Sequence, residues 1–384
     1  MTRQTSARPR FKVATVVGAR PQFIKCAPVS KRLRQVGNEV LVHTGQHYDE
    51  NMSARFFEEL EIPQPDYNLN VGAGTHGTQT AQMLERIAEI LTREKPDWVL
   101  VYGDTNSTLA GALAAVKLHI PVAHVEAGLR SFYRRMPEEI NRVLTDHISA
   151  LHFCPTETAV RNLTAEGIRD RVFLVGDVMY DVMQDNLARA ERSSTILQRL
   201  MLKPNEYILA TIHRAENTDD PVALKNICDA IDQITALRKR VVFPAHPRTF
   251  NRLEAIGALS RLEASLLPPV SYLDMLKLVQ SAALVMTDSG GVQKEAYWLS
   301  VPCVTLRNDT EWIETVESGW NILAGNEQND IVHAVRQFLE EPSPVAVTAP
   351  RQRASNQLVD VLCEESDRGS RYFSPRRARQ VAAR

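Results

Sequence analysis

Three acidic side chains are candidates for contact with a ligand, and two of them, Asp104 and Glu126, each end an apolar run of the sequence. Asp104 follows Val-Tyr-Gly, Glu126 lies within the run His124-Val-Glu-Ala-Gly, and Glu138 lies within Met136-Pro-Glu-Glu. A carboxylate at a strand end either caps the next helix or exchanges protons with a bound molecule. These three residues are therefore our candidates for acid–base chemistry.

The three acids differ in whether helix capping or proton transfer explains their position better. For Asp104 both stay open, with Asn106 and Ser107 as rival caps. Glutamate is a poor cap, and burial of Glu126 among small and apolar residues would disfavour its ionised form, which suits proton transfer. Glu138 precedes a helix expected at 139–147, where a carboxylate suits the helix dipole in any case.

A phosphate site is indicated by the run Asp288-Ser289-Gly290-Gly291, which follows an apolar segment and opens a helical one. Backbone amides at a helix N-terminus bind phosphate, and the two glycines allow a ligand to approach closely. Glu295 lies one turn into that helix, where it can accept hydrogen bonds from ribose hydroxyls. The alternative is a tight turn with a capping serine and an ordinary helix carboxylate.

Two cations follow the first apolar run. The turn Gly18-Ala-Arg-Pro-Gln22 contains Arg20, and Lys25 lies one helical turn further on. From these places both can face one anion, which suits a diphosphate. The alternative is that they are solvated, as cations near helix starts commonly are.

Two histidines also follow apolar runs. His213 ends the run 207–212 beside Arg214, and there it can bind phosphate or move protons near neutral pH. A histidine buried in the core is the alternative. His246 lies between two prolines, so a rigid loop is a sufficient explanation for it.

Short β-branched runs alternate with helical periodicity along most of the chain. Strands are expected at 11–17, 39–43, 98–102, 122–125 and 172–175, and again at 207–212, 241–243, 283–287 and 303–306. This alternation indicates doubly wound parallel sheets, which bind ligands at the carboxyl ends of their strands. We predict an N-terminal Rossmann-like domain at 1–178 with the carboxylates, a C-terminal Rossmann-like domain at 179–365 with the phosphate site, and a basic tail at 366–384.

Composition excludes several classes of protein. A chain of 384 residues fits two domains, and its five cysteines contain no C-x-x-C pair, which argues against structural zinc and a disulfide framework. The net charge of −1 gives no global field for nucleic acid or membrane. Without a signal-peptide segment or an apolar stretch of about 18 residues, the protein is expected to be cytoplasmic. The basic ends look like solvated tails.

Seven stretches together carry a resemblance to an enzyme family. They are GARPQFIK (18–25), VYGDTNSTLAG (101–111), HVEAGLRS (124–131), MPEEINR (136–142), FCPTE (153–157), IHRAEN (212–217) and TDSGGVQKEA (287–296). With them the chain resembles the non-hydrolysing UDP-N-acetylglucosamine 2-epimerases from about residue 11 to 325. The resemblance implies two Rossmann-like domains facing across a cleft, the glycosyltransferase B-type architecture, and a homodimer without metal or nicotinamide cofactor.

The resemblance also implies a reaction and a set of site residues. UDP is eliminated across C1–C2, leaving a 2-acetamidoglucal, and is added back with the C2 proton on the opposite face, giving UDP-N-acetylmannosamine. Asp104, Glu126 and Glu138 carry over as the acid–base and electrostatic set, and His213 as a catalytic or diphosphate partner. The implied substrate-binding residues are Arg20, Lys25, Val270, Met275, Ser289, Gly290, Gly291 and Glu295.

Three departures from the usual family sequence leave the exact sugar open. Many members read GTRPE where this chain has GARPQ, QHR where it has Gln46-His-Tyr48, and Glu-Arg-Pro-Glu where it has Glu311-Trp-Ile-Glu314. The second departure places Tyr48 where the resemblance implies an arginine that serves an allosteric substrate site, so the presence of that site stays open. The variant resembles epimerases of UDP-2,3-diacetamido-2,3-dideoxy-glucuronate, so that sugar is a second possible substrate. The functions of a hydrolysing epimerase, a glycosyltransferase and a silent UDP-sugar sensor also stay open.

Overall fold

The computed structural model describes residues 11–46, 62–236, 239–341 and 352–367, which divide into two compact units. Unit 1 runs to Val182 and includes the C-terminal helix, whereas unit 2 begins at Met183. The basic tails, as well as His47 and Tyr48 of the departure noted above, lie outside the described ranges. Each unit is described by itself.

Unit 1 is built on a parallel sheet. Within its described residues the sheet has seven strands in the order β3-β2-β1-β4-β5-β6-β7. These are β1 (Lys12–Val17), β2 (Asn38–His43), β3 (Tyr67–Asn68), β4 (Trp98–Tyr102), β5 (Val122–Val125), β6 (Leu151–Cys154) and β7 (Val172–Leu174). Its central strands are buried on both faces, as the near-continuous Val, Ile and Leu runs of the sequence require.

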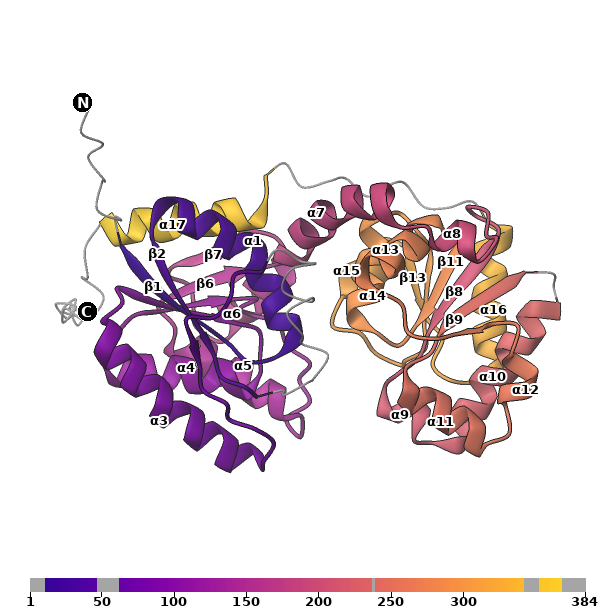
Figure 1. Ribbon diagram of the computed structural model, residues 1–384, viewed down its shortest axis with the longest axis horizontal. Coiled ribbons are helices and arrows are strands. Elements are labelled where there is room, and N and C mark those ends of the chain that lie inside the picture. Colours follow the sequence, from indigo (N-terminus) through magenta and orange to yellow (C-terminus); the bar gives the residue numbers. More distant parts are fainter. Residues whose placement is uncertain (1–10, 47–61, 237–238, 342–351, 368–384) are drawn as a thin grey trace, which may run out of the picture. The chain divides into compact units, whose positions relative to one another are not determined.

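Helices cover both faces of this sheet. They are α1 (Arg20–Val36), α3 (His76–Glu94), α4 (Asn106–Lys117), α5 (Pro137–Ile148), α6 (Glu157–Ala165), α7 (Val178–Ser193) and α17 (Ala354–Asp367). Figure 1 shows α1 and α17 on one face, with α3, α4 and α5 on the other. Helix α7 continues from unit 1 into unit 2.

Unit 2 repeats the same design. Its described strands form a parallel sheet in the order β10-β9-β8-β11-β12-β13. They are β8 (Tyr207–Thr211), β9 (Arg240–Pro244), β10 (Leu266–Leu267), β11 (Leu284–Thr287), β12 (Cys303–Thr305) and β13 (Asn321–Leu323). The helices are α8 (Ile196–Arg199), α9 (Ala215–Thr218), α10 (Pro221–Ala236), α11 (Pro247–Ala255), α12 (Leu259–Leu262), α13 (Tyr272–Ser281), α14 (Gly290–Trp298), α15 (Ile313–Glu317) and α16 (Gln328–Glu340). The predicted class, two Rossmann-like α/β sheets, is confirmed.

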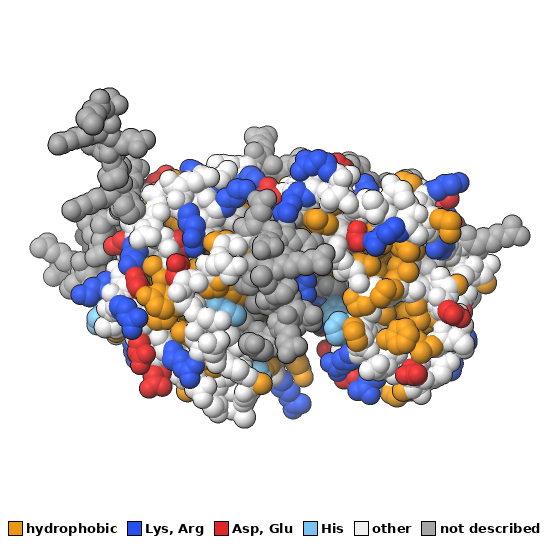
Figure 2. Space-filling model, in the orientation of Figure 1, with side chains coloured by type: hydrophobic (Ala, Val, Ile, Leu, Met, Phe, Trp, Pro, Cys, Tyr) orange, Lys and Arg blue, Asp and Glu red, His pale blue; other side chains and the backbone are white. Residues whose placement is uncertain are grey.

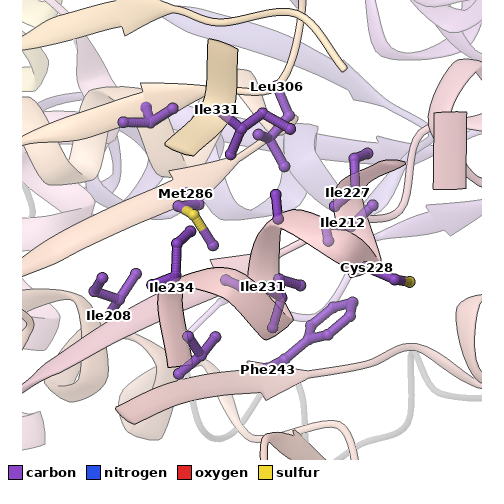
Figure 3. Close-up of a cluster of buried hydrophobic side chains, with 14 of the residues drawn as sticks. Ile208, Ile212, Ile227, Cys228, Ile231, Ile234, Phe243, Met286, Leu306 and Ile331 are labelled. Atoms are coloured by element: carbon purple, nitrogen blue, oxygen red, sulfur yellow. The ribbon is translucent and has the colours of Figure 1, made fainter. Parts of the chain in front are cut away.

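The core of unit 2 shows why α10 forms where it does. Its Ile227, Ile231 and Ile234 recur at helical spacing, and all three are buried. Figure 3 shows them against side chains of the sheet, including Phe243 and Met286. Burying each such side chain contributes about 1.5–3 kcal/mol, so this stripe fixes the helix on its sheet.

Helix α17 belongs to a different unit from the one that the sequence predicts for it. That boundary places residues 354–365 in the C-terminal domain, but α17 packs on α1 in unit 1, with Leu358 and Leu362 fully buried. The buried Asp181 carboxylate accepts the backbone N–H of Ser355 at 2.8 Å and caps the start of α17. At the other end the Trp98 indole donates to Ser366 Oγ at 2.9 Å.

Three further observations concern surface charge, helix apolarity and metal-ligating side chains in the described residues. On the face in Figure 2, Lys and Arg side chains are interspersed with Asp and Glu rather than gathered into a region of one sign. Among the described helices, none has the length and apolarity to cross a membrane. In the same residues, no three His, Cys, Asp or Glu side chains are grouped so as to hold a metal ion.

Candidate active site

Both sheets bring predicted site residues to the point where strand order reverses. In unit 1 this point lies between β1 and β4, and in unit 2 between β8 and β11. Loops that leave neighbouring strands diverge there and open a crevice for a ligand. The turn carrying Arg20 follows β1 and Asp104 follows β4, whereas His213 follows β8 and Asp288 follows β11.

The turn after β1 is fixed by Gln22, which sequence reasoning treated only as a departure. Its Oε1 accepts the backbone N–H groups of Gly18 at 2.8 Å and Ala19 at 3.1 Å. Its Nε2 donates to the Tyr102 carbonyl at 2.7 Å, at the end of β4. An ionised glutamate could not make this last bond, so the amide ties the two switch-point loops together. Arg20, next in the turn, is exposed at the start of α1.

Asp104 is not a helix cap. The N-cap of α4 is Thr105, whose Oγ1 accepts the Thr108 N–H at 3.4 Å, so the capping interpretations of Asp104, Asn106 and Ser107 were wrong. The Asp104 carboxylate instead forms an ion pair with Arg142. Capping is thus excluded for Asp104, and its part in the chemistry stays a prediction.

Helix α5 connects Asp104 with Glu138. Arg142 belongs to α5, and Asn141 of the same helix donates to the Asp104 carbonyl at 2.9 Å. Because α5 begins at Pro137, Glu138 lies in its first turn rather than before it, and it is partly exposed. The neighbouring Glu139 is buried and accepts the backbone N–H groups of Ser131 and Phe132, each at 2.9 Å. Glu139 therefore shapes the loop before α5, while Glu138 stays accessible.

Glu126 occupies a strained and buried position. Its φ of +67° is left-handed, a conformation that costs a non-glycine residue about 1 kcal/mol or more. Gly103 makes room for it, since a Cβ there would lie 3.3 Å from Glu126 Oε2. Backbone strain of this kind concentrates at functional sites, where it holds a side chain ready for use.

Lys25 forms an ion pair with Glu126, across 101 residues of sequence. Burial alone would lower the pKa of Lys25, but the charge and hydrogen bond of Glu126 raise it above its ordinary value. Lys25 thus stays charged and supplies a counter-charge for Glu126. Sequence analysis expected Glu126 to be buried, which the structure confirms, but did not predict this cation beside it.

In unit 2 the Asp288 carboxylate organises the loop that carries His213. It is fully buried and accepts the backbone N–H of Arg214 at 3.0 Å and the Asn217 amide at 3.1 Å. His213 Nδ1 lies 3.2 Å from Asp288 Oδ1, and the imidazole is 54% exposed. Burial would raise the pKa of Asp288, but His213 and these donors hold it below its ordinary value. An ionised carboxylate thus orients an accessible histidine, and the buried-core interpretation of His213 was wrong.

The Gly-Gly start of α14 does not use Ser289 as a side-chain cap. Ser289 occupies the N-cap position without a capping hydrogen bond, and its own N–H donates to Thr287 Oγ1 at 2.9 Å. The capping interpretation was therefore wrong. A Cβ on Gly290 would lie 3.2 Å from the indole nitrogen of Trp312, so glycine lets that ring lie against the helix start.

Glu295 of α14 is hydrogen-bonded to Tyr272 at the start of α13. Glu295 is 5% exposed and accepts the Tyr272 hydroxyl at 2.9 Å. Burial raises the pKa of Glu295 to about 7, against the opposing effects of the Tyr272 hydrogen bond and the Lys294 charge. Near neutral pH this carboxyl can therefore both donate and accept hydrogen bonds.

Three further residues have more ordinary surroundings. Val270 and Met275 are partly buried and pack against one core cluster of unit 2. His246 is the N-cap of α11, with Nδ1 accepting the Arg248 N–H at 3.3 Å, which agrees with its interpretation as part of a rigid loop.

Comparison with known proteins identifies the family. The family model described as UDP-N-acetylglucosamine 2-epimerase matches residues 31–362. A Methanococcus maripaludis protein named "UDP-N-acetylglucosamine 2-epimerase homolog" is 54% identical over 357 residues, covering 92% of this chain and 99% of its own length. The chain belongs to the UDP-N-acetylglucosamine 2-epimerase family.

Two further relatives are named for different UDP-sugars. A UDP-2,3-diacetamido-2,3-dideoxy-D-glucuronate 2-epimerase of Pseudomonas aeruginosa is 52% identical, covering 86% of this chain and 92% of its own. The crystal structure of Methanocaldococcus jannaschii UDP-GlcNAc 2-epimerase in complex with UDP-GlcNAc and UDP matches with a TM-score of 0.80 at 46% identity, covering 92% of this chain and 99% of that one. The resemblance drawn from the seven stretches is thus confirmed at the level of the family.

Sequence analysis missed two residues that lie beside the predicted site residues of unit 2. Tyr272 gave no signal, because a tyrosine at a helix start looks like core. Lys294 was also missed; its ammonium lies 3.8 Å from the centre of the Trp312 ring. The indole that marks this family variant therefore holds a cation beside the Gly-Gly turn.

The Glu295→Gln variant should change how stability depends on pH. With a pKa of about 7 in the fold, the protonated carboxyl stabilises the protein below its ordinary pKa of 4.5, and this contribution is lost as pH rises towards 7. Glutamine cannot ionise, so relative to wild type the variant should gain roughly 3 kcal/mol in free energy of unfolding between pH 4.5 and pH 8.

Urea unfolding followed by tryptophan fluorescence measures this gain, because Trp298, Trp312 and Trp320 of the four tryptophans belong to unit 2. The exposed Glu263→Gln serves as the matched control and should show no such trend. An equal difference from wild type at both pH values would contradict the assignment.

Proposed function

We propose that this protein catalyses reversible C2 epimerisation of UDP-N-acetylglucosamine to UDP-N-acetylmannosamine by elimination and re-addition of UDP. The observation that carries the proposal is the strained, buried Glu126, which pairs with Lys25, while Asp104 follows the switch-point strand β4 of the same unit. Family membership supports it, as do relatives named for this activity. In this proposal unit 1 performs the proton transfers and unit 2 binds the nucleotide.

The chemistry follows from the weak acidity of the C2 proton. Cleavage of C1–O must run ahead of deprotonation, so positive charge builds on the ring, and nearby carboxylates stabilise it. Inversion requires that a proton leave one face and return to the other, which needs separate groups. Asp104, Glu126 and Glu138 are the groups proposed for this work. Lys25, which the sequence assigns to the diphosphate, is proposed to hold the Glu126 side chain in place.

The nucleotide is proposed to lie on unit 2. Ser289, Gly290 and Gly291 present backbone amides for the diphosphate, and Glu295 faces the ribose hydroxyls. His213, oriented through Nδ1 by Asp288, would meet the leaving phosphate with Nε2. The switch point between β8 and β11 supports this placement, because these residues follow those two strands.

The test is proton exchange at C2. Purified protein is incubated with UDP-N-acetylglucosamine in D2O without an acceptor, and products are followed by NMR. Deuterium at C2 with accumulating UDP-N-acetylmannosamine is expected. Free N-acetylmannosamine plus UDP would indicate a hydrolysing epimerase instead, and an inert substrate would contradict the proposal for this sugar.

A second candidate substrate is UDP-2,3-diacetamido-2,3-dideoxy-glucuronate. It is favoured by the 52% identity to the Pseudomonas aeruginosa enzyme and by Trp312, the variant residue that lies against the α14 start. Running the same experiment with both sugars ranks them by kcat/KM. The sugar with the higher kcat/KM is the preferred substrate.

A further inference from the structure

A buried carboxylate that the proposed reaction does not use lies behind the candidate catalytic residues. Asp146 on α5 is 1% exposed. Its Oδ1 lies 2.7 Å from His124 Nδ1, and its Oδ2 accepts the Gly128 N–H at 3.1 Å. His124 and Gly128 stand two residues before and two residues after Glu126. A single carboxylate therefore contacts the His124 side chain on one side of Glu126 and the Gly128 backbone on the other.

The residue between these two contacts, Glu126, has a strained backbone. Glu126 has the left-handed φ of +67°, and a non-glycine residue keeps such a conformation only when its surroundings determine it. Gly128 is itself left-handed, at +82°, and a Cβ there would lie 2.3 Å from the Ala159 carbonyl oxygen. The segment from 124 to 128 is thus fixed by contacts at both ends.

The same network reaches the second candidate carboxylate. His124 Nε2 lies 2.7 Å from the carbonyl oxygen of Gly103, the residue before Asp104. A carbonyl oxygen and a carboxylate both accept, so the His124 ring donates at each nitrogen. His124 therefore links Asp146 to the turn after β4, while its own strand leads to Glu126.

Asp146 also pairs with Arg130, and Arg130 in turn pairs with Glu166. Arg130 Nη1 lies 2.8 Å from Asp146 Oδ2, and Arg130 Nε lies 2.7 Å from Glu166 Oε1. Burial would raise the pKa of Asp146, but His124 and Arg130 bring it below its ordinary value. The carboxylate is therefore ionised and remains an acceptor for all of its partners.

We propose that Asp146 and His124 are positioning residues that place the Glu126 and Asp104 carboxylates for reaction, an inference that rests on the proposed function. Neither needs to touch the substrate. Loss of the network lets the two turns relax, and a displacement of about 1 Å at reacting groups costs on the order of 100-fold in rate.

The kinetic test compares three variants with wild type. Asp146→Ala removes every acceptor, and His124→Phe keeps a ring but loses both N–H groups. Each should lower kcat about 100-fold or more, while KM and the dissociation constant of UDP stay within about threefold. Asp146→Asn should recover part of kcat, because an amide can still accept from Gly128 and bond a neutral ring.

A matched control separates positioning from general loss of stability. Asp181 is also a 1% exposed carboxylate of unit 1, but it caps α17. Asp181→Asn should lower Tm and leave kcat of the folded protein within about twofold of wild type. If Asp146→Ala does not fold, the same measurements on His124→Phe test the proposal. Loss of UDP binding parallel to kcat, or no rescue by asparagine, would overturn the proposal.

A crystal structure of His124→Phe decides the matter without any activity. We expect Glu126 to leave its left-handed conformation or to lose Lys25, and an unchanged Glu126–Lys25 pair would refute the positioning role. Should wild type be inert towards both UDP-sugars, the proposed function fails, yet this structural outcome still decides what Asp146 and His124 do.

Discussion

Replacing Glu126 by glutamine is expected to lower kcat at least about 1,000-fold while the dissociation constant of UDP stays within a few fold. Glutamine keeps an oxygen that can accept from Lys25, so the fold around the pair should persist. What disappears is the ability to take and return a proton. Steady-state kinetics by NMR and calorimetric titration with UDP measure the two quantities.

The control for Glu126→Gln is another buried glutamate of the same unit. Glu39 has a fully buried side chain and bonds to Thr15 at 2.7 Å and to Arg34 at 2.7 Å, at the start of β2. Glu39→Gln should reduce stability but not the kcat of the folded enzyme. An equal loss of UDP affinity in Glu126→Gln would remove Glu126 from the proton-transfer set and make it a ligand contact.

The second large effect is expected at Lys25. Lys25→Met leaves Glu126 buried without its counter-charge, and breaking a buried pair from one side costs about 3–5 kcal/mol. The double variant Lys25→Met/Glu126→Gln should recover most of that loss, since no unpaired charge remains. Urea unfolding followed by circular dichroism gives the four free energies of this cycle.

UDP titration of Lys25→Met distinguishes the two roles assigned to this lysine. The sequence suggests a diphosphate ligand, which predicts much weaker UDP binding. The ion pair with Glu126 predicts loss of stability and kcat with nearly unchanged affinity. Additive destabilisation in the double variant, together with weakened UDP binding, would restore the diphosphate assignment.

Much of the fold could be predicted because its signals are local. Buried parallel strands appear as β-branched runs, and each of the motif-bearing strands ends at a glycine or polar turn that is visible in the sequence. Asp104 after Val101-Tyr-Gly and Ser289 after Thr287-Asp are examples. Their positions at the carboxyl ends of strands then follow from the geometry of a parallel sheet.

Other features could not be predicted because they depend on distant residues. The pairing of Lys25 with Glu126 joins segments 101 residues apart, and the sign of the Glu126 φ angle is set by its surroundings. Thr105 rather than Asp104 caps α4 because the backbone geometry, not the residue type, selects among adjacent polar side chains. The contact between His124 and Asp146 joins β5 to α5, and no local pattern in the sequence indicates it.

The attachment of α17 to α1 has a consequence for how this chain is made. A ribosome delivers the strands and the candidate acids of unit 1 early, but the segment that covers α1, with Leu358 and Leu362, emerges only after all of unit 2. Until then the nascent N-terminal half presents an uncovered apolar helix face. Completion of unit 1 therefore waits until unit 2 has been synthesised, so a chain that stops before residue 354 contains Asp104, Glu126 and Glu138 and still lacks α17.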